Sequence, residues 1–283
     1  MPDPVTISFE SKCVSYISCV HKDPARGIVR RAPCTGFFWR NDGMPYLVTN
    51  RHCVTGKNSQ NLLFSEQGFE PTHLQVYFNQ RGKSLGDAVT EYHWKGIEIS
   101  LFSDGAPQWF EHPHGSLIDI VAVALDEPEY LSVDCVNDRK VYDSWKPEVG
   151  ADCYIVGYPE GLSGAEATPI WKRASIATEP EMDYKGQEVF LCDSATRPGL
   201  SGGPVFGKAH VFSTQGLERI DPYAEGVQFL GSWPVFLGVY AGREGNESDG
   251  FQLARVWKRQ VLAELFDQLQ KAASPFKIND LGH

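Results

Sequence analysis

Short runs of β-branched and aromatic residues recur along most of the chain and alternate with turn residues. Such runs predict β-strands where glycine, proline, asparagine or aspartate bounds them. They lie at residues 13–20, 36–39, 46–49, 74–78, 118–125, 153–156, 188–191, 204–206 and 235–240. The 27 glycines and 18 prolines supply the turns between them. Many short strands with frequent turns predict an all-β fold, either a sandwich or a barrel.

A helical period replaces the strand pattern near the C-terminus. Apolar residues there recur close to helical spacing, at Val256, Val261, Leu262, Leu265, Phe266 and Leu269. Pro275 follows as a stop signal. The pattern predicts one amphipathic helix, residues 256–273, that packs on its own domain. Residues 79–116 are rich in glycine, charge and aromatic side chains without a clean period, which predicts a long loop with a hairpin.

Composition narrows the class of protein. Hydrophobic residues make up 42% and charged residues 22% of the 283 positions, as is usual for a globular protein. Lys and Arg number 26 against 36 Asp and Glu, so the net charge is −10. This balance argues against nucleic-acid and anionic-membrane partners. The longest uncharged stretch, residues 227–242, contains glycines and a proline, and it predicts two strands rather than a membrane-spanning helix.

Cysteine usage and the N-terminus bear on location and on metal binding. The seven cysteines are an odd number, and no two have the Cys-x-x-Cys spacing of a zinc site. Residues 1–12 lack the basic start and apolar run of a secretory leader. We therefore expect a cytoplasmic protein with reduced thiols, no metal and no other cofactor. Glu111, His112 and His114 form a weak metal-like cluster, which we expect to serve packing because a proline separates the two histidines.

The strongest chemical signal is the segment 197–204, Arg-Pro-Gly-Leu-Ser-Gly-Gly-Pro. Glycines allow positive φ and let another group approach the backbone closely. Such a turn aims the N–H groups of Gly199 and Ser201 at one point beside the Ser201 hydroxyl, where an oxyanion would be stabilised. The alternative is a glycine-rich hairpin whose serine has no chemical role.

A nucleophilic serine needs a base, and the base needs an orienting carboxylate. Among the eight histidines, His52 is the candidate base because it follows the β-rich run 46–49, which would hold it on a rigid element. Asp119 is the only charge within the apolar segment 116–125, and a buried carboxylate requires a partner. The alternatives are a core histidine and an aspartate at an exposed strand start.

These three residues occur in the chain order His, Asp, Ser of a known catalytic template. The sequence resembles the trypsin-like serine proteases, and most closely their HtrA-type bacterial branch, over about residues 10–270. The segments that carry the resemblance are residues 35–38 and 47–53 before and around His52, residues 118–123 around Asp119, and residues 192–204 around Ser201, the last matching without a gap. Residues 238–242 and 250–254 resemble the strands that border the substrate cleft of this family.

The resemblance implies two antiparallel six-stranded β-barrels within a single peptidase domain, residues 1–283. The parts would be an N-terminal barrel, residues 10–130, with His52 and Asp119; a C-terminal barrel, residues 150–255, with Ser201; and the helix 256–273 packed behind them. It also implies acyl transfer to Ser201 with His52 as the base and Asp119 as its orienting carboxylate. The amides of Gly199 and Ser201 would form the oxyanion hole. Because His52 must be neutral to accept a proton, activity would fall below about pH 6–7.

The resemblance bears on the substrate as well. The positions that would line the specificity pocket are Ala195, Thr196, Tyr240, Ala241 and Gly242. Ala195 stands where Arg/Lys-specific relatives carry an aspartate, and Tyr240 stands where glutamyl-specific relatives tend to carry a histidine. A small or medium uncharged P1 side chain is therefore implied. Arg197 and Arg243 lie either at the pocket rim or on the solvated surface.

Three cysteine positions match those of secreted relatives. Cys34 and Cys53 stand where many of these relatives have a disulfide beside the histidine, and in this chain we expect thiols. Cys153 matches another such position, but Gly207 occupies the place of its usual partner. The missing partner favours a reduced protein.

Three functions compete. The favoured one is an active serine endopeptidase that acts on a protein or peptide substrate. The second is a catalytically silent pseudoprotease that serves as a protein-binding module, and the third is an esterase or other acyl hydrolase with the same site. The absence of a leader and of regulatory domains suggests, as a hypothesis, a regulatory protein partner.

Overall fold

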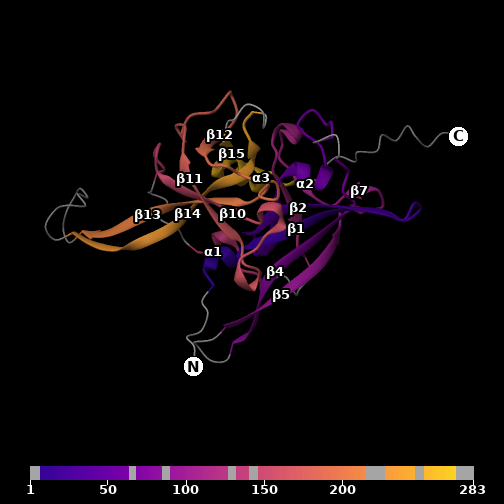
Figure 1. The fold of residues 1–283 in the computed structure, drawn as a ribbon, viewed down its shortest axis with the longest axis horizontal. Coiled ribbons are helices and arrows are strands. Elements are labelled where there is room, and N and C mark those ends of the chain that lie inside the picture. Colours follow the sequence, from indigo (N-terminus) through magenta and orange to yellow (C-terminus); the bar gives the residue numbers. More distant parts are fainter. Residues whose placement is uncertain are drawn as a thin grey trace.

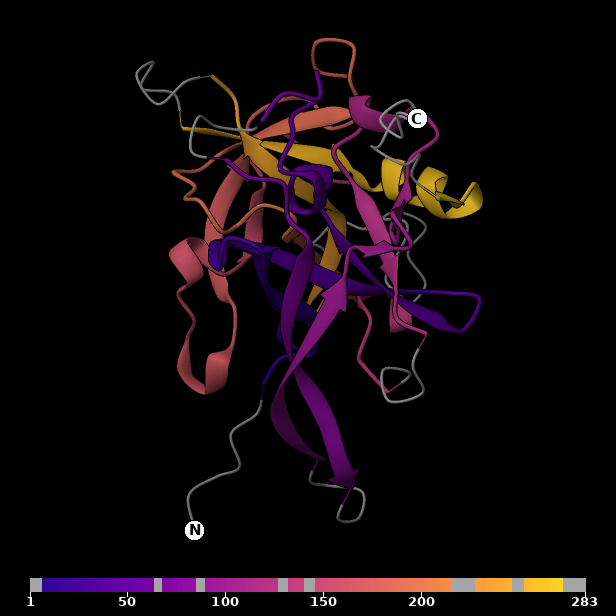
Figure 2. The same ribbon diagram turned by 90° about the vertical axis from the view of Figure 1, so that its right-hand side faces the viewer.

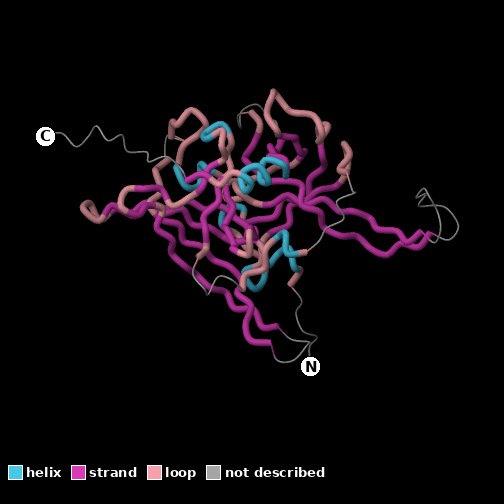
Figure 3. Tube along the Cα trace, turned by 180° about the vertical axis from the view of Figure 1, so that it is seen from behind, coloured by secondary structure: helices cyan, strands magenta, loops and turns pink. Residues whose placement is uncertain are grey.

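The computed structural model describes residues 7–63, 68–84, 90–126, 132–139, 146–214, 227–245 and 252–271. Strands make up most of these residues, and the helices are short (Figure 3). The all-β class predicted from the sequence is confirmed.

The C-terminal half forms a closed antiparallel barrel of six strands in the order β10-β11-β12-β15-β14-β13. The strands are β10 (Asp152–Gly157), β11 (Ile170–Ile176), β12 (Val189–Asp193), β13 (Pro204–Thr214), β14 (Val227–Arg243) and β15 (Leu253–Lys258). Buried side chains such as Ile155, Phe190 and Val205 fill its interior, as in other barrels of this size. One of the two predicted barrels is thereby confirmed. The β13–β14 hairpin projects well beyond the barrel (Figure 1).

The N-terminal half is an eight-stranded sheet in the order β16-β8-β9-β3-β2-β1-β4-β5, so the second six-stranded barrel is not confirmed among the described residues. The strands are β1 (Val14–Asp23), β2 (Ile28–Asn41), β3 (Met44–Thr49), β4 (His73–Ser84), β5 (Thr90–Ser100), β8 (Phe110–Glu111), β9 (Val121–Ala124) and β16 (Gln270–Lys271). One edge gains β16 from the end of the chain, which pairs with β8. At the other edge the β4–β5 hairpin extends past the body of the sheet (Figure 2).

The segment 79–116, predicted as a long loop with a hairpin, is largely regular structure. β4 pairs with β5 from His73 opposite Ser100 to Ser84 opposite Thr90. The short strands β6 (Phe102–Ser103) and β7 (Ala106–Pro107) follow and pair with each other. The hairpin is therefore confirmed, whereas the loop is much shorter than predicted; residues 85–89 at its tip lie outside the described residues.

The helical elements are α1 (Phe9–Lys12), α2 (Arg51–Thr55) and α3 (Arg259–Asp267), with 3-10 turns η1 (Gly115–Leu117), η3 (Val136–Asp138), η4 (Pro159–Gly161) and η5 (Ala165–Ala167). The predicted C-terminal helix, 256–273, is present as α3, but it begins at Arg259 and ends at Asp267, and Gln270–Lys271 form strand β16 instead. Val256 pairs with Phe190 and Tyr240 in the barrel, and this ladder overrides the helical spacing. In the described part of the chain, no helix has both the length and the apolar character needed to cross a membrane.

One apolar cluster joins the two halves. Phe236 of β14 lies at its centre, with its ring centroid 5.5 Å from that of Phe37 in β2 and 6.1 Å from that of Phe206 in β13. Trp39 packs on Phe236 at 5.5 Å and stacks on Phe266 of α3 at 6.2 Å. Because strands of both halves and helix α3 share this core, the junction between the halves is a packed interface.

We expect Phe236→Ala to lower the free energy of unfolding by about 3–5 kcal/mol, because it removes the ring that both halves contact. Denaturant titration followed by tryptophan fluorescence measures the loss. Met182→Ala, at a side chain that is 67% exposed, is the control and should change stability by no more than about 0.5 kcal/mol. Equal effects of the two substitutions would mean that the junction core does not stabilise the fold.

Candidate active site

His52 lies on a one-turn helix that begins where β3 ends. Asn50 is the N-cap, in extended conformation, and α2 ends at Gly56, whose φ is 69° and whose N–H donates to the His52 carbonyl at 2.8 Å. A Cβ at Gly56 would lie 1.9 Å from the Phe69 carbonyl oxygen, so only glycine fits there. The sharp change from strand to helix turns the His52 side chain out of the sheet.

The His52 side chain meets the Asp119 carboxylate. Asp119 lies between η1 and β9, and the pairing of Thr49 with Val121 brings it beside α2. His52 Nδ1 is 2.7 Å from Asp119 Oδ2, and the His52 backbone N–H donates to Oδ1 at 2.9 Å. The Asn50 amide donates to the Asp119 carbonyl at 2.7 Å. Both oxygens of the Asp119 carboxylate thus contact residue 52 and fix the position of α2. With the His52 proton on Nδ1, facing Asp119, Nε2 is left as the acceptor nitrogen.

The pKa of His52 reflects two opposed effects. Burial disfavours the imidazolium and lowers the pKa, because a charge is costly in a low-dielectric environment. The negative charge of Asp119, together with its hydrogen bond, outweighs burial and raises the pKa well above its usual value. The site therefore stabilises the protonated imidazole. Because His52 can accept a proton only when it is neutral, the raised pKa places the pH below which it cannot act as a base above the value of about 6–7 expected from the sequence.

The turn that carries Ser201 packs directly against the segment around His52. The Ser201 carbonyl accepts from the Thr35 N–H at 2.9 Å and lies 4.0 Å from Cys53 Sγ, one residue after His52. Gly202 has a φ of 84°, and a Cβ there would lie 2.3 Å from both the Thr35 carbonyl oxygen and Thr49 Oγ1. This close approach brings the three predicted residues, His52, Asp119 and Ser201, to the junction of the two halves.

The backbone before Ser201 has a defined direction at Gly199. The Pro198 carbonyl accepts from the Glu160 N–H at 2.7 Å, and the chain has no cis peptide in its described part. Because carbonyl and N–H point to opposite sides of a trans peptide, the Gly199 N–H points away from Glu160. Among the described residues, neither the Gly199 nor the Ser201 N–H donates to a backbone carbonyl.

Thr35 ties this turn to the neighbouring loop. Its hydroxyl donates to the Gly199 carbonyl at 2.7 Å and accepts from the Tyr158 N–H at 3.0 Å. A Cβ at Gly199, where φ is 93°, would lie 2.4 Å from the Tyr158 carbonyl oxygen. Sequence analysis gave Thr35 no role, although it is the first residue of the segment 35–38 that carried the family resemblance.

Of the predicted specificity residues, Thr196 and Tyr240 are in direct contact. The Tyr240 hydroxyl donates to Thr196 Oγ1 at 2.7 Å, and both side chains are buried. Burial raises the pKa of Tyr240 to about 12, so the hydroxyl stays protonated. Ala195 is exposed next to Thr196, while Ala241 and Gly242 continue β14 at a break in its register with β15.

Arg197 and Arg243, for which the sequence allowed either the pocket rim or the solvated surface, lie in different environments. The Arg243 guanidinium donates to the Thr196 carbonyl, so it is tied to the segment that leads to Ser201. Arg197 is exposed. Arg243 therefore lies beside the predicted specificity residues rather than on the solvated surface away from them.

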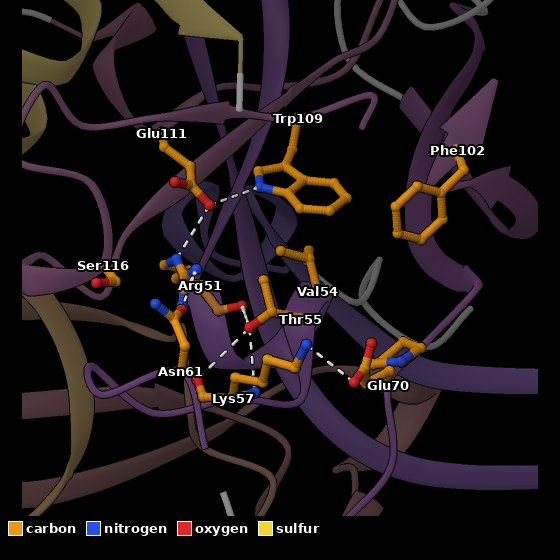
Figure 4. Close-up of a pocket in the computed structure, with 11 residues that line it drawn as sticks. Arg51, Val54, Thr55, Lys57, Asn61, Glu70, Phe102, Trp109, Glu111 and Ser116 are labelled. Atoms are coloured by element: carbon orange, nitrogen blue, oxygen red, sulfur yellow. Dashed lines mark hydrogen bonds and ion pairs between the residues drawn. The ribbon is translucent and has the colours of Figure 1, made fainter. Parts of the chain in front are cut away.

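A pocket of about 460 Å³ lies beside α2 (Figure 4). Arg51, the residue before His52, lines it and donates to Glu111 Oε1 at 3.0 Å and to Asn61 Oδ1 at 2.9 Å. Lys57 Nζ pairs with Glu70 at 2.9 Å on the same pocket. Its charges are thus largely compensated in pairs, and sequence analysis did not predict the pocket.

The cluster Glu111, His112 and His114 is not arranged as a metal site. Glu111 faces Arg51, whereas His112 Nε2 lies 3.2 Å from Glu264 Oε2 on α3. The other ring nitrogen of His112 accepts from the His114 N–H at 3.2 Å. These partners agree with the predicted packing role.

All seven cysteines are thiols. Cys153 lies opposite Gly207 in the β10–β13 ladder, so the position implied for its partner is indeed glycine. Its sulfur is instead 3.4 Å from that of Cys192, a contact that the sequence did not predict.

The family model of the trypsin-like peptidase domain matches residues 34–211, more than half of the chain. The chain belongs to the trypsin-like peptidase family. No curated protein sequence matches it. It is similar to two solved structures of the Rv3671c protease from M. tuberculosis. The active form is 17% identical with a TM-score of 0.49, covering 93% of this chain and 83% of that one, and a mutant in its inactive form is 16% identical with a TM-score of 0.46, covering 93% and 91%.

Membership in this family makes the chain a hydrolase of the peptidase type, with protein or peptide as the substrate class. Beyond the matched residues, β14 and β15 complete the closed barrel, and α3 contributes to the junction core.

We expect Gly202→Ala to destabilise this peptidase by about 2–5 kcal/mol. The left-handed conformation contributes about 1–2 kcal/mol, and the clash with backbone and side-chain oxygens adds about 1–3 kcal/mol. Gly186→Ala is the matched control, because Gly186 has a φ of 72° and no atom within 4 Å of its added Cβ. Chemical denaturation measures both. An equal loss in the two variants would mean that the Ser201 turn is not tightly packed against β2 and β3.

Proposed function

We propose that this trypsin-like peptidase is a serine endopeptidase that uses Ser201 as nucleophile, His52 as base and Asp119 as the orienting carboxylate. The observation that carries the proposal is the pair of contacts between Asp119 and His52, 2.7 Å at Nδ1 and 2.9 Å at the backbone N–H, beside the turn that carries Ser201. Both carboxylate oxygens fix the base, which supports a catalytic rather than a merely structural histidine.

The proposed reaction is acyl transfer in two stages. His52 Nε2 accepts the Ser201 hydroxyl proton as Oγ attacks the peptide carbonyl carbon, and the imidazolium that forms is stabilised by Asp119. The imidazolium then donates that proton to the leaving amine, which leaves an acyl-enzyme ester on Ser201. Water attacks the ester with the same proton transfers and releases the second product.

The amides of Gly199 and Ser201 are the proposed oxyanion donors. The bond from Glu160 to the Pro198 carbonyl turns the Gly199 N–H to the other side of its peptide plane, and this direction supports the role. A preorganised donor pair stabilises the charge that develops on the carbonyl oxygen without moving during the reaction.

The finer assignments are part of the same proposal. The Thr196–Tyr240 hydrogen bond closes that side of the specificity region without a free charge, and with Ala195, Ala241 and Gly242 it favours a small or medium uncharged P1 side chain. We assign residues 1–283 to one peptidase domain, with 10–130 contributing His52 and Asp119 and 150–255 contributing Ser201. Within the family, residues 192–204 favour the HtrA-type branch.

Labelling with a fluorophosphonate tests the proposal. We expect one stoichiometric adduct per chain, mapped by peptide mass spectrometry to Ser201 and lost in Ser201→Ala, because the activated hydroxyl is the group that attacks phosphorus. The labelled protein should also lose turnover of a protein substrate such as casein. A folded chain that gives no adduct at neutral pH would instead be a pseudoprotease, and one that cleaves an activated ester but no protein would be an acyl hydrolase.

Thr35→Val should lower kcat for a peptide substrate by about 10–1000-fold with little change in KM. The valine keeps the shape but removes the hydroxyl that holds the Gly199 carbonyl, and a misplaced oxyanion donor costs up to about 1000-fold in rate. Thr35→Ser retains the hydroxyl and should keep most of the activity. Circular dichroism melting checks that both variants fold; a folded Thr35→Val chain with unchanged kcat would exclude a positioning role for Thr35.

A further inference from the structure

We propose that Cys19, Cys34 and Cys53 form a three-sulfur site for a divalent, closed-shell, thiophilic cation of the Zn²⁺ type. The three residues come from different elements, β1, β2 and α2, so their convergence does not follow from a local sequence motif. The argument for the site does not rest on the proposed peptidase activity, although Cys53 directly follows His52 in α2.

The geometry is close to that of a thiolate metal site. The ligand atoms of all three residues lie within 4.8 Å of one another, and the sulfurs of Cys19 and Cys34 are 3.4 Å apart. A zinc–sulfur distance of about 2.3 Å requires sulfurs about 3.8–4.0 Å apart in tetrahedral or trigonal coordination. Side-chain adjustments of less than an ångström therefore suffice to bring the three sulfurs around one ion.

The three sulfurs lie in an apolar environment. All three residues are at least 93% buried in one apolar cluster that also contains Val54, Leu74 and other core side chains. Cys135 belongs to the same cluster, but its thiol faces the Val133 carbonyl instead. Within the described part of the chain, Cys19, Cys34 and Cys53 are the one group of three potential metal ligands gathered at a point.

Charge selects the type of cation. Three thiolates with a divalent ion leave one net negative charge, whereas a monovalent ion would leave two in an apolar core, where an uncompensated charge is costly. Soft thiolate ligands also exclude the hard cations that prefer oxygen. Binding displaces thiol protons to solvent and forms metal–sulfur bonds without any change of oxidation state.

A disulfide is the competing fate of these cysteines, and it predicts a different chemistry. A disulfide joins two sulfurs at about 2.0 Å and leaves the third as a thiol. A metal site engages all three sulfurs at once. The number of sulfurs around a bound ion therefore separates the two interpretations.

The test uses the full chain, reduced and handled without oxygen. Zn²⁺ is titrated in competition with a chromophoric chelator, and X-ray absorption at the zinc edge counts the sulfur neighbours. We expect one tightly bound Zn²⁺ per chain with three sulfur neighbours, and a Cd²⁺-loaded sample should show thiolate-to-metal charge-transfer absorption. The wild-type spectra need no variant, so they remain decisive if a cysteine substitution unfolds the chain.

Two variants locate the ion. Cys19→Ala removes one of the three ligands. Loss of a ligand's hydrogen-bonding partner alone weakens metal binding roughly 10–100-fold, so loss of the ligand itself should weaken Zn²⁺ binding by more than that. Cys135→Ala, which removes a buried thiol from the same apolar cluster, should bind Zn²⁺ like the wild type. The proposal is overturned if the wild type binds no Zn²⁺ more tightly than Cys19→Ala, if the bound ion has fewer than three sulfur neighbours, or if Cys135→Ala abolishes binding.

Discussion

The fully buried Thr35 is the point at which the two halves of this peptidase are locked together. Its N–H donates to the Ser201 carbonyl, its hydroxyl bridges the Gly199 carbonyl and the Tyr158 N–H, and its own carbonyl accepts from the Thr49 hydroxyl. One residue of β2 thus satisfies polar groups of the turn before β13, of the loop after β10 and of the end of β3. A buried polar group that loses its partner costs about 1–3 kcal/mol, so these bonds depend on one another.

Close packing around Thr35 explains why glycines surround it. A Cβ at Gly157 would lie 2.5 Å from the Thr35 hydroxyl oxygen, and one at Gly202 would lie 2.3 Å from the Thr35 carbonyl oxygen. The backbone of both loops therefore lies where side chains would otherwise stand. The hydrogen bonds of Thr35 and the aromatic core around Phe236 both join the two halves; the former are polar and directional, and the latter is apolar and nondirectional.

The sequence was informative where chemistry and local pattern agree. Asp119 stood out as a lone charge in an apolar segment because a buried carboxylate requires a partner, and the structure gives it His52 as that partner. His52 stood out by its place after a β-rich run, and Ser201 by the glycines around it. The N-terminal boundary of α3 was wrong by three residues because Val256 satisfies both strand pairing and helical spacing, and its pairing with Phe190 and Tyr240 decides between them.

Other features depend on long-range contacts that no local pattern contains. Closure of a sheet depends on which edges meet, and β16 reaches β8 only after the chain has passed through the whole barrel. Cys153 and Cys192 meet inside that barrel although β11 separates their strands in the sheet. The convergence of Cys19, Cys34 and Cys53 has the same origin, since spacing rules detect ligands of one loop and not of three elements.

The position of α2 connects the proposed catalytic centre with the thiol cluster. His52 and Cys53 are successive residues of a one-turn helix, so their side chains leave its axis about 100° apart. One side chain contacts Asp119 and the other contacts the sulfurs of β1 and β2. A helix of this length has too few internal hydrogen bonds to hold its own orientation. The direction of the imidazole is therefore set jointly by the Asp119 carboxylate on one face and by the packing of Cys53 on the other.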